Sequence, residues 1–144
     1  MAQGGGSARD FDFWVGDWDV YGPQGRQVGR NTIALLFDGG ALSEHWRGDG
    51  GVEGHSLNAY DPSAERWHQT WVDSTGGLLL LDGGLADGSM VLEGAAPGQG
   101  GALERQRITW TPEDAGVRQH WESSTDDGVS WQTAFDGHYH PHSA

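Results

Sequence analysis

The sequence lacks cysteine and lysine, and it has no long hydrophobic run. Without cysteine the fold cannot rely on disulfides or on thiolate metal sites. Apolar runs such as Leu78 to Leu81 are far too short to span a bilayer. The first ten residues are rich in glycine and lack the apolar core of a signal peptide, which predicts a flexible tail on a cytoplasmic protein.

Positive charge is also scarce. The sequence has eight arginines and 21 acidic residues, which gives a formal net charge of −13. Such a surplus repels phosphate backbones and anionic lipids, so we expect neither a nucleic-acid partner nor a membrane partner. An acidic surface is also an ordinary route to solubility, and this interpretation is the simpler one.

Glycine and tryptophan are abundant instead. The 25 glycines suit many tight turns and disfavour long helices. Eight tryptophans must line either a core or a ligand cavity, because each indole has a large apolar face and a single N–H donor. A chain of 144 residues is long enough for one domain with a core of its own.

Alternating apolar and polar residues, separated by turn residues, predict an almost purely β structure. A short helix is expected at 11–15 with Asp10 as its cap, and a loose loop at 97–101. We predict ten strands near residues 17–21, 30–37, 41–47, 55–60, 67–73, 78–81, 90–94, 106–111, 117–123 and 131–139.

Ten short strands with hairpin-length connections predict an all-β fold. We expect an antiparallel up-and-down β-barrel of about eight to ten strands, because closure removes exposed edges and leaves room for one small ligand. The barrel is expected to occupy residues 11–140 as a single domain, between tails at 1–10 and 141–144.

Several segments resemble a bacterial family of single-domain lipocalin-like (calycin) proteins of unknown function. The matching stretches are FDFWVGDWDV at 11–20, HSLNAYDP at 55–62, WHQTWVD at 67–73, RITWTP at 107–112, VRQHWE at 117–122 and FDGHY at 135–139. The resemblance implies a lipocalin-like barrel in which Trp18 helps close the floor. It implies no particular activity, so function has to be argued from the site.

Strand alternation divides the side chains into two faces. The charged face holds His45, Arg47, His68, Thr70, Arg118, His120, Glu122, Asp136 and His138, and we assign it to solvent. The aromatic face, with isolated amides and one carboxylate, is assigned to the interior. It holds Leu42, Glu44, Trp46, Ser56, Asn58, Tyr60, Trp67, Gln69, Trp71, Gln119, Trp121, Phe135 and Tyr139.

Buried amides among aromatic walls are typical of a small-molecule site. The first hypothesis is therefore a binding protein for a small aromatic or lipophilic molecule, in a cavity of roughly 300 Å³ or more. The expected ligand-binding residues are Trp46, Asn58, Tyr60, Gln69, Trp71, Gln119, Trp121 and Tyr139. The alternative is a filled barrel in which the polar groups satisfy one another; the oligomeric state, including a homodimer, stays open.

Glu44 is the candidate catalytic residue. Its neighbours on the same face, Leu42 and Trp46, would desolvate the carboxyl, raise its pKa and suit it to general acid or base chemistry. The second hypothesis is accordingly a cofactor-independent lyase, isomerase or hydratase. The simpler interpretation of Glu44 is an ion pair with Arg107 or Arg118.

A third hypothesis uses histidines. If the two faces were exchanged, His45, His68 and His120 would converge and could hold a metal ion, or one of them could bind haem. Isolated histidines on the outer face of strands are common, however. We therefore expect no cofactor.

Overall fold

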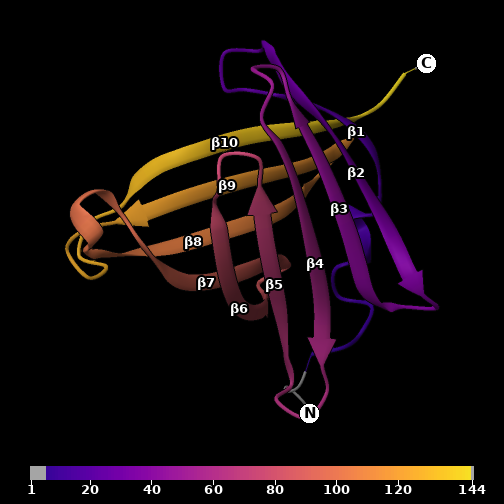
Figure 1. Cartoon of the computed structure of the whole chain (residues 1–144). Helices are drawn as coiled ribbons and strands as arrows, with labels where there is room; N and C mark the ends of the chain where they lie inside the picture. The colour runs from indigo at the N-terminus through magenta and orange to yellow at the C-terminus, as the bar shows by residue number, and fades with distance from the viewer. Residues whose placement is uncertain (1–5, 144) are drawn as a thin grey trace.

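The computed structural model describes residues 6–143 and shows a closed antiparallel barrel of ten strands (Figure 1). Each strand pairs with its neighbour in sequence, and β1 closes the ring against β10, so the predicted up-and-down barrel is confirmed. The strands are β1 (Gly16–Tyr21), β2 (Gln27–Phe37), β3 (Gly40–Gly48), β4 (Glu53–Asp61), β5 (Arg66–Asp73), β6 (Leu78–Ala86), β7 (Ser89–Pro97), β8 (Leu103–Glu113), β9 (Gly116–Ser124) and β10 (Gln132–Pro141).

Every predicted strand is present, and β6, β7 and β8 are much longer than expected. The sequence predicts that β6 ends at Leu81, but the strand continues through Gly83 and Gly84 to Ala86. Here the glycine serves close packing of backbones and not a turn. A Cβ on Gly83 would lie 2.0 Å from the carbonyl oxygen of Val91 on β7, so only a residue without a side chain fits.

The predicted helix is a single 3-10 turn, η1 (Asp12–Trp14), and its capping residue is not Asp10. Phe11 occupies the N-cap position, and no side chain caps it. The Asp10 carboxylate instead accepts a hydrogen bond from the backbone N–H of Ser7, at 2.8 Å. A second 3-10 turn, η2 (Gln99–Gly101), lies within the predicted loop.

Aromatic side chains close one end of the barrel. Phe11 and Trp14 of η1 are fully buried and stack on each other with ring centroids 4.8 Å apart. Phe11 also meets Trp67 and Trp110 edge to face, at 5.6 and 5.1 Å. We call Phe11, Trp14, Trp67 and Trp110 the aromatic plug. Trp18 is buried beside the plug and donates its indole N–H to the Trp14 carbonyl at 2.9 Å.

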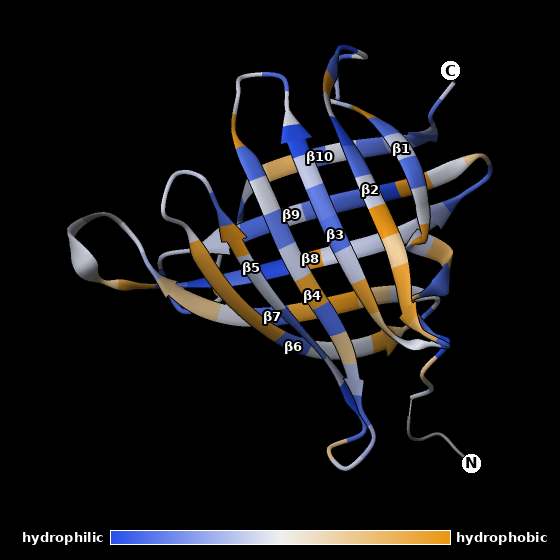
Figure 2. Ribbon diagram, turned by 45° about the vertical axis from the view of Figure 1, so that its right-hand side comes forward, coloured by the Kyte–Doolittle hydropathy of each residue, from blue (hydrophilic) through white to orange (hydrophobic). Residues whose placement is uncertain are grey.

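The strand faces lie as the alternation predicts. Figure 2 shows hydrophobic and hydrophilic segments mixed within the barrel wall. Along β4, Ser56 and Asn58 are buried, whereas the preceding His55 and the intervening Leu57 are exposed. Since successive side chains of a strand point to opposite faces, this pattern brings polar groups into the barrel together with the aromatic ones.

The N-terminal segment is described from Gly6 onward. The carbonyl of Gly6 accepts a hydrogen bond from the Tyr60 hydroxyl at 2.7 Å, and that of Ser7 accepts one from the Trp67 indole at 3.3 Å. Residues 1–5 and 144 lie outside the described residues, so the predicted tails and domain limits stay predictions. Neither helix in the described part of the chain is long and apolar enough to cross a membrane, and the cytoplasmic location stays a prediction.

Candidate functional site

The barrel contains a partly open cavity of about 110 Å³, and none of the plug residues lines it. This volume is smaller than the roughly 300 Å³ of a typical ligand site, so it admits a compact molecule only. Its walls are formed by Glu44, Trp46, Gln69, Trp71, Leu79, Ile108, Gln119, Trp121, Phe135 and Tyr139. The cavity is therefore apolar for most of its surface, with a few polar groups set into it.

Glu44 projects from β3 into this cavity and is only 5% exposed. Its Oε1 accepts a hydrogen bond from the Ser56 hydroxyl at 2.6 Å, and its Oε2 accepts one from the Asn31 amide at 2.8 Å. Burial raises the pKa of Glu44, and these two hydrogen bonds offset only part of that effect. The carboxyl is thus suited to exchanging a proton inside the barrel.

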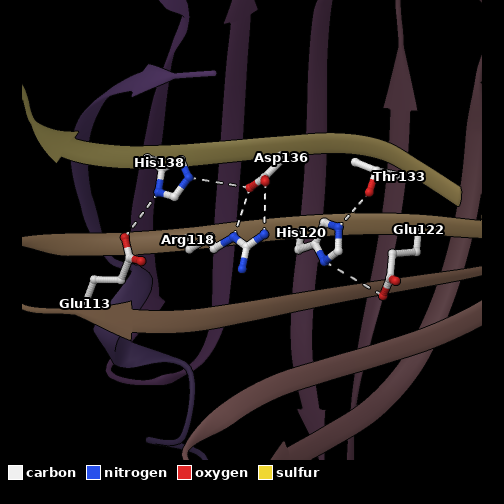
Figure 3. Close-up of polar contacts among 7 residues, drawn as sticks. All are labelled: Glu113, Arg118, His120, Glu122, Thr133, Asp136 and His138. Carbon is white, nitrogen blue, oxygen red and sulfur yellow. Dashed lines mark hydrogen bonds and ion pairs between the residues drawn. The ribbon is translucent and has the colours of Figure 1, made fainter. Parts of the chain in front are cut away.

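The predicted ion pairs of Glu44 do not form. Arg118 pairs with Asp136 and Arg107 pairs with Glu122, at 2.9 and 3.2 Å, on the outer face of the barrel. Figure 3 shows Arg118 on β9 with its guanidinium toward Asp136 on β10, within a group of charged and polar side chains. Within residues 6–143, no arginine or histidine lines the cavity, so Glu44 has no positively charged neighbour there.

A continuous series of hydrogen bonds runs along the inner wall through Glu44. Tyr139 on β10 is central to one arm: its hydroxyl accepts from Asn31 at 2.8 Å and donates to Gln119 at 2.5 Å. Burial and the nearby Glu44 carboxyl raise the pKa of Tyr139, so its hydroxyl stays protonated. In order, the series joins Gln69, Asn58, Ser56, Glu44, Asn31, Tyr139 and Gln119.

Three indoles form the walls above these polar groups. The indole N–H of Trp71 donates to Asp73 at 3.0 Å, and that of Trp121 donates to Gln106 at 2.7 Å. Trp46 packs edge to face on Phe135, with ring centroids 5.8 Å apart. These contacts orient the rings as lining of the cavity.

Most of the predicted site residues meet in the cavity, and two do not. Asn58 is fully buried behind the wall, where it accepts a hydrogen bond from Gln69 at 2.8 Å. Tyr60 lies at the plug end and packs on Trp67 at 5.9 Å. The predicted residues that line the cavity are Glu44, Trp46, Gln69, Trp71, Gln119, Trp121 and Tyr139.

Sequence reasoning missed Asn31, which directly contacts Glu44, and Gln106, which binds Trp121. It also missed Leu79 and Ile108 in the cavity wall. A signal for Asn31 was present, since Asn31 alternates with the apolar Ile33 on a predicted strand. Nothing in the sequence separates Leu79 and Ile108 from ordinary core residues.

The histidines of the third hypothesis lie on the outer face and do not converge. His68 contacts Asp82 and Thr70, whereas His120 contacts Thr133 at 2.9 Å on another part of the barrel (Figure 3). His45 is hydrogen-bonded to Glu53 and stacks on His55 at 4.2 Å. His45, Glu53 and His55 form a cluster on the outer face whose ligand atoms lie within 4.8 Å of one another, and neither His68 nor His120 belongs to it.

Comparisons with known proteins identify no relative of this chain. No protein-family model matches the chain, and no curated protein matches it. The function is therefore argued from the cavity and its side chains.

Proposed function

We propose that this protein is a lipocalin-like binding protein that takes up one small aromatic or lipophilic molecule. The observation that carries the proposal is the cavity itself, in which three indoles surround one carboxyl and two amides. The cavity is smaller than the expected volume of roughly 300 Å³, and therefore the proposal is restricted to compact molecules. The closed up-and-down barrel and the buried Trp18 are compatible with the lipocalin-like family that the sequence resembles.

The contacts within the wall leave polar groups available to a ligand. Gln69 donates through its Nε2 to Asn58, and its Oε1 has no hydrogen-bond partner among the described residues. Gln119 accepts through its Oε1 from Tyr139, and its Nε2 has none in the same part of the chain. One acceptor and one donor therefore face a cavity whose walls suit a single ring.

Intrinsic fluorescence provides the test. A panel of one-ring compounds is titrated into the protein, and we expect at least one to give saturable quenching, confirmed by calorimetry. Trp121→Ala should weaken that binding because it removes a wall of the cavity. Trp131→Ala is the control, since Trp131 stacks on Arg107 away from the cavity wall, with the guanidinium 4.0 Å from the ring centroid. Absence of saturable binding, or equal affinity in the Trp121 variant, would contradict the proposal.

A second candidate function is proton-transfer catalysis in the same cavity. It is favoured by Glu44, a buried carboxyl with a raised pKa that lines the space a substrate would occupy. Glu44 would add or remove the proton in a cofactor-independent lyase, isomerase or hydratase reaction. The Gln119 amide would then stabilise a developing oxyanion.

Turnover of a bound compound separates the enzyme from the carrier. Each compound that binds is incubated with the protein and followed by NMR for loss or exchange of protons. Glu44→Gln should abolish any conversion while the circular dichroism spectrum stays unchanged. Full conversion by the variant would remove Glu44 from the mechanism.

A further inference from the structure

Glu44 is the one acidic or basic side chain among the residues that line the cavity in the described part of the chain. The only other titratable group there is Tyr139, from β10. The groups packed directly against the carboxyl from β2 and β4, Asn31 and Ser56, carry no charge. On β3 itself, His45 and Arg47 point to the opposite face. The cavity thus contains a carboxyl without a counter-charge.

The hydrogen bonds around Glu44 have a defined direction. Asn58 faces its Nδ2 toward both the Leu42 carbonyl, at 3.5 Å, and the Ser56 hydroxyl oxygen, at 2.9 Å. Because Ser56 accepts from Asn58, its own hydrogen is free to donate to Glu44. Asn31 donates to the other oxygen. Donors therefore converge on Glu44 from two strands, and such an arrangement stabilises the ionised carboxylate.

The walls supply the second half of a cation site. The faces of indole rings attract positive charge, and Trp46, Trp71 and Trp121 all line the same cavity as Glu44. The formal net charge of −13 further raises the local concentration of cations around the molecule. Anionic ligands face repulsion both from this field and from Glu44.

We propose that the cavity selects small organic cations, with an amidinium or ammonium group against Glu44 and an apolar ring between the indoles. This proposal rests on the proposed binding function and specifies its ligand class. The free Oε1 of Gln69 offers the cation a second acceptor. A planar amidinium fits best, because its two N–H groups can bind both oxygens of one carboxylate in parallel.

Cation binding is also expected to release a proton. Burial raises the pKa of Glu44 in the empty cavity. At pH values near this raised pKa, some protein molecules carry a neutral, protonated Glu44. A bound cation favours the ionised form and lowers that pKa. Affinity for a permanent cation should therefore rise with pH across the titration of Glu44. Calorimetry in two buffers with different ionisation enthalpies measures the released proton.

Three nearly isosteric probes test the charge preference: benzamidinium, benzamide and benzoate. With the wild-type protein, we expect benzamidinium to bind about tenfold more tightly than benzamide, since its hydrogen bonds are charge-assisted, and benzoate to bind worst. Titration calorimetry gives the three dissociation constants, and tryptophan fluorescence gives an independent reading of the same order.

Glu44→Gln should remove the preference while keeping the shape of the cavity. Its amide oxygen can accept from Ser56. Its NH₂ replaces the oxygen that accepts from the Asn31 Nδ2, so the Asn31 amide has to rotate and present its Oδ1, which is buried without a partner among the described residues. Glu122→Gln is the matched control, since it deletes an equal charge from the outer face, where Glu122 pairs with Arg107. We expect that control to retain the full preference for benzamidinium.

The outcomes separate this proposal from the function on which it rests. Equal or tighter binding of benzamide overturns the cation preference and leaves the binding function standing. An unchanged preference in the Glu44 variant assigns the selectivity to another group and also overturns the proposal. Binding of none of the three probes contradicts the cation proposal and the uptake of one-ring ligands together.

Discussion

The six-membered ring of Trp71 lies over Gly54 on the neighbouring strand, so closely that a Cβ at position 54 would stand 2.1 Å from a ring carbon. Gly29 has the same relationship to Trp46, at 2.4 Å. Carbon atoms in contact prefer about 3.5–4.0 Å, so a side chain on either glycine would displace the ring. Both indoles line the cavity. Because the two glycines have no side chain, the rings can pack against the strand backbone, and this leaves the cavity open.

Gly54→Ala should therefore close the site without touching a polar group. The methyl group forces the Trp71 ring toward the cavity, so we expect a loss of ligand affinity of tenfold or more, or about 1.4 kcal/mol. Overpacking should also lower the free energy of unfolding by about 1–3 kcal/mol. Calorimetry with any bound compound measures the effect. Gly50→Ala is the control, because a Cβ there meets nothing within 4 Å. Equal affinity in the two variants would show that the ring can move elsewhere.

The stability of the protein should depend on pH through Glu44. Burial raises the folded-state pKa above the ordinary value of 4.5, so the folded protein binds its proton more tightly than the unfolded chain. The stability that Glu44 contributes is complete below the unfolded pKa and is lost as pH rises through the folded pKa. Each unit of the shift is worth about 1.4 kcal/mol.

Urea unfolding of wild type and Glu44→Gln at a series of pH values measures this loss. As pH rises above 4.5, the wild type should lose the free energy of unfolding that protonated Glu44 contributes, whereas the variant should not. The difference between the two should change until the folded-state carboxyl is fully ionised. A constant difference across the series would mean that Glu44 titrates alike in the folded and unfolded protein.

Two tryptophan substitutions should differ greatly in their effect on stability. Trp110 is fully buried in the aromatic plug, and Trp110→Ala should lower the free energy of unfolding by about 3–5 kcal/mol. Trp131 stacks on Arg107 outside the barrel, and its replacement should cost about 0.5–1 kcal/mol. Chemical denaturation monitored by circular dichroism compares them. Similar losses would contradict the assignment of the plug as the stabilising core.

The hydrogen bond between Tyr139 and Gln119 can be isolated by a double-mutant cycle. Tyr139→Phe removes the hydroxyl that donates to Gln119 and should destabilise the protein by about 1 kcal/mol, because the partly buried Gln119 oxygen loses its partner. Combined with Gln119→Leu, the loss should be smaller than the sum of the single losses, by about 1 kcal/mol. Additive losses would show that the two groups do not interact in solution.

The arrangement of the barrel wall was largely predictable from period-two alternation. The alternation identifies Glu44, Gln69 and Gln119 as members of one face, and the structure places all three in the cavity. Alternation works here because each strand has one buried face, which fixes the register of its side chains. The closed ring also follows from the short connections between consecutive strands.

The height of a residue along the barrel was not predictable in the same way. Tyr60 shares its face with Asn58, yet it lies at the plug end because strand parity says nothing about position along the barrel axis. The contact of Asn31 with Glu44 depends on how β2 is registered against β3, where Asn31 stands opposite Trp46. That register comes from pairing between strands and cannot be read from either strand alone.

Closure of the ring by β1 and β10 has a consequence for synthesis of the protein. Trp18 pairs with Pro141, so the barrel joins the earliest and latest strands to emerge from the ribosome. Until β10 arrives, the nascent chain has two open sheet edges, which favour association with other chains. It also lacks Phe135 and Tyr139, so a ligand present during translation would meet a complete binding site only in the finished ring.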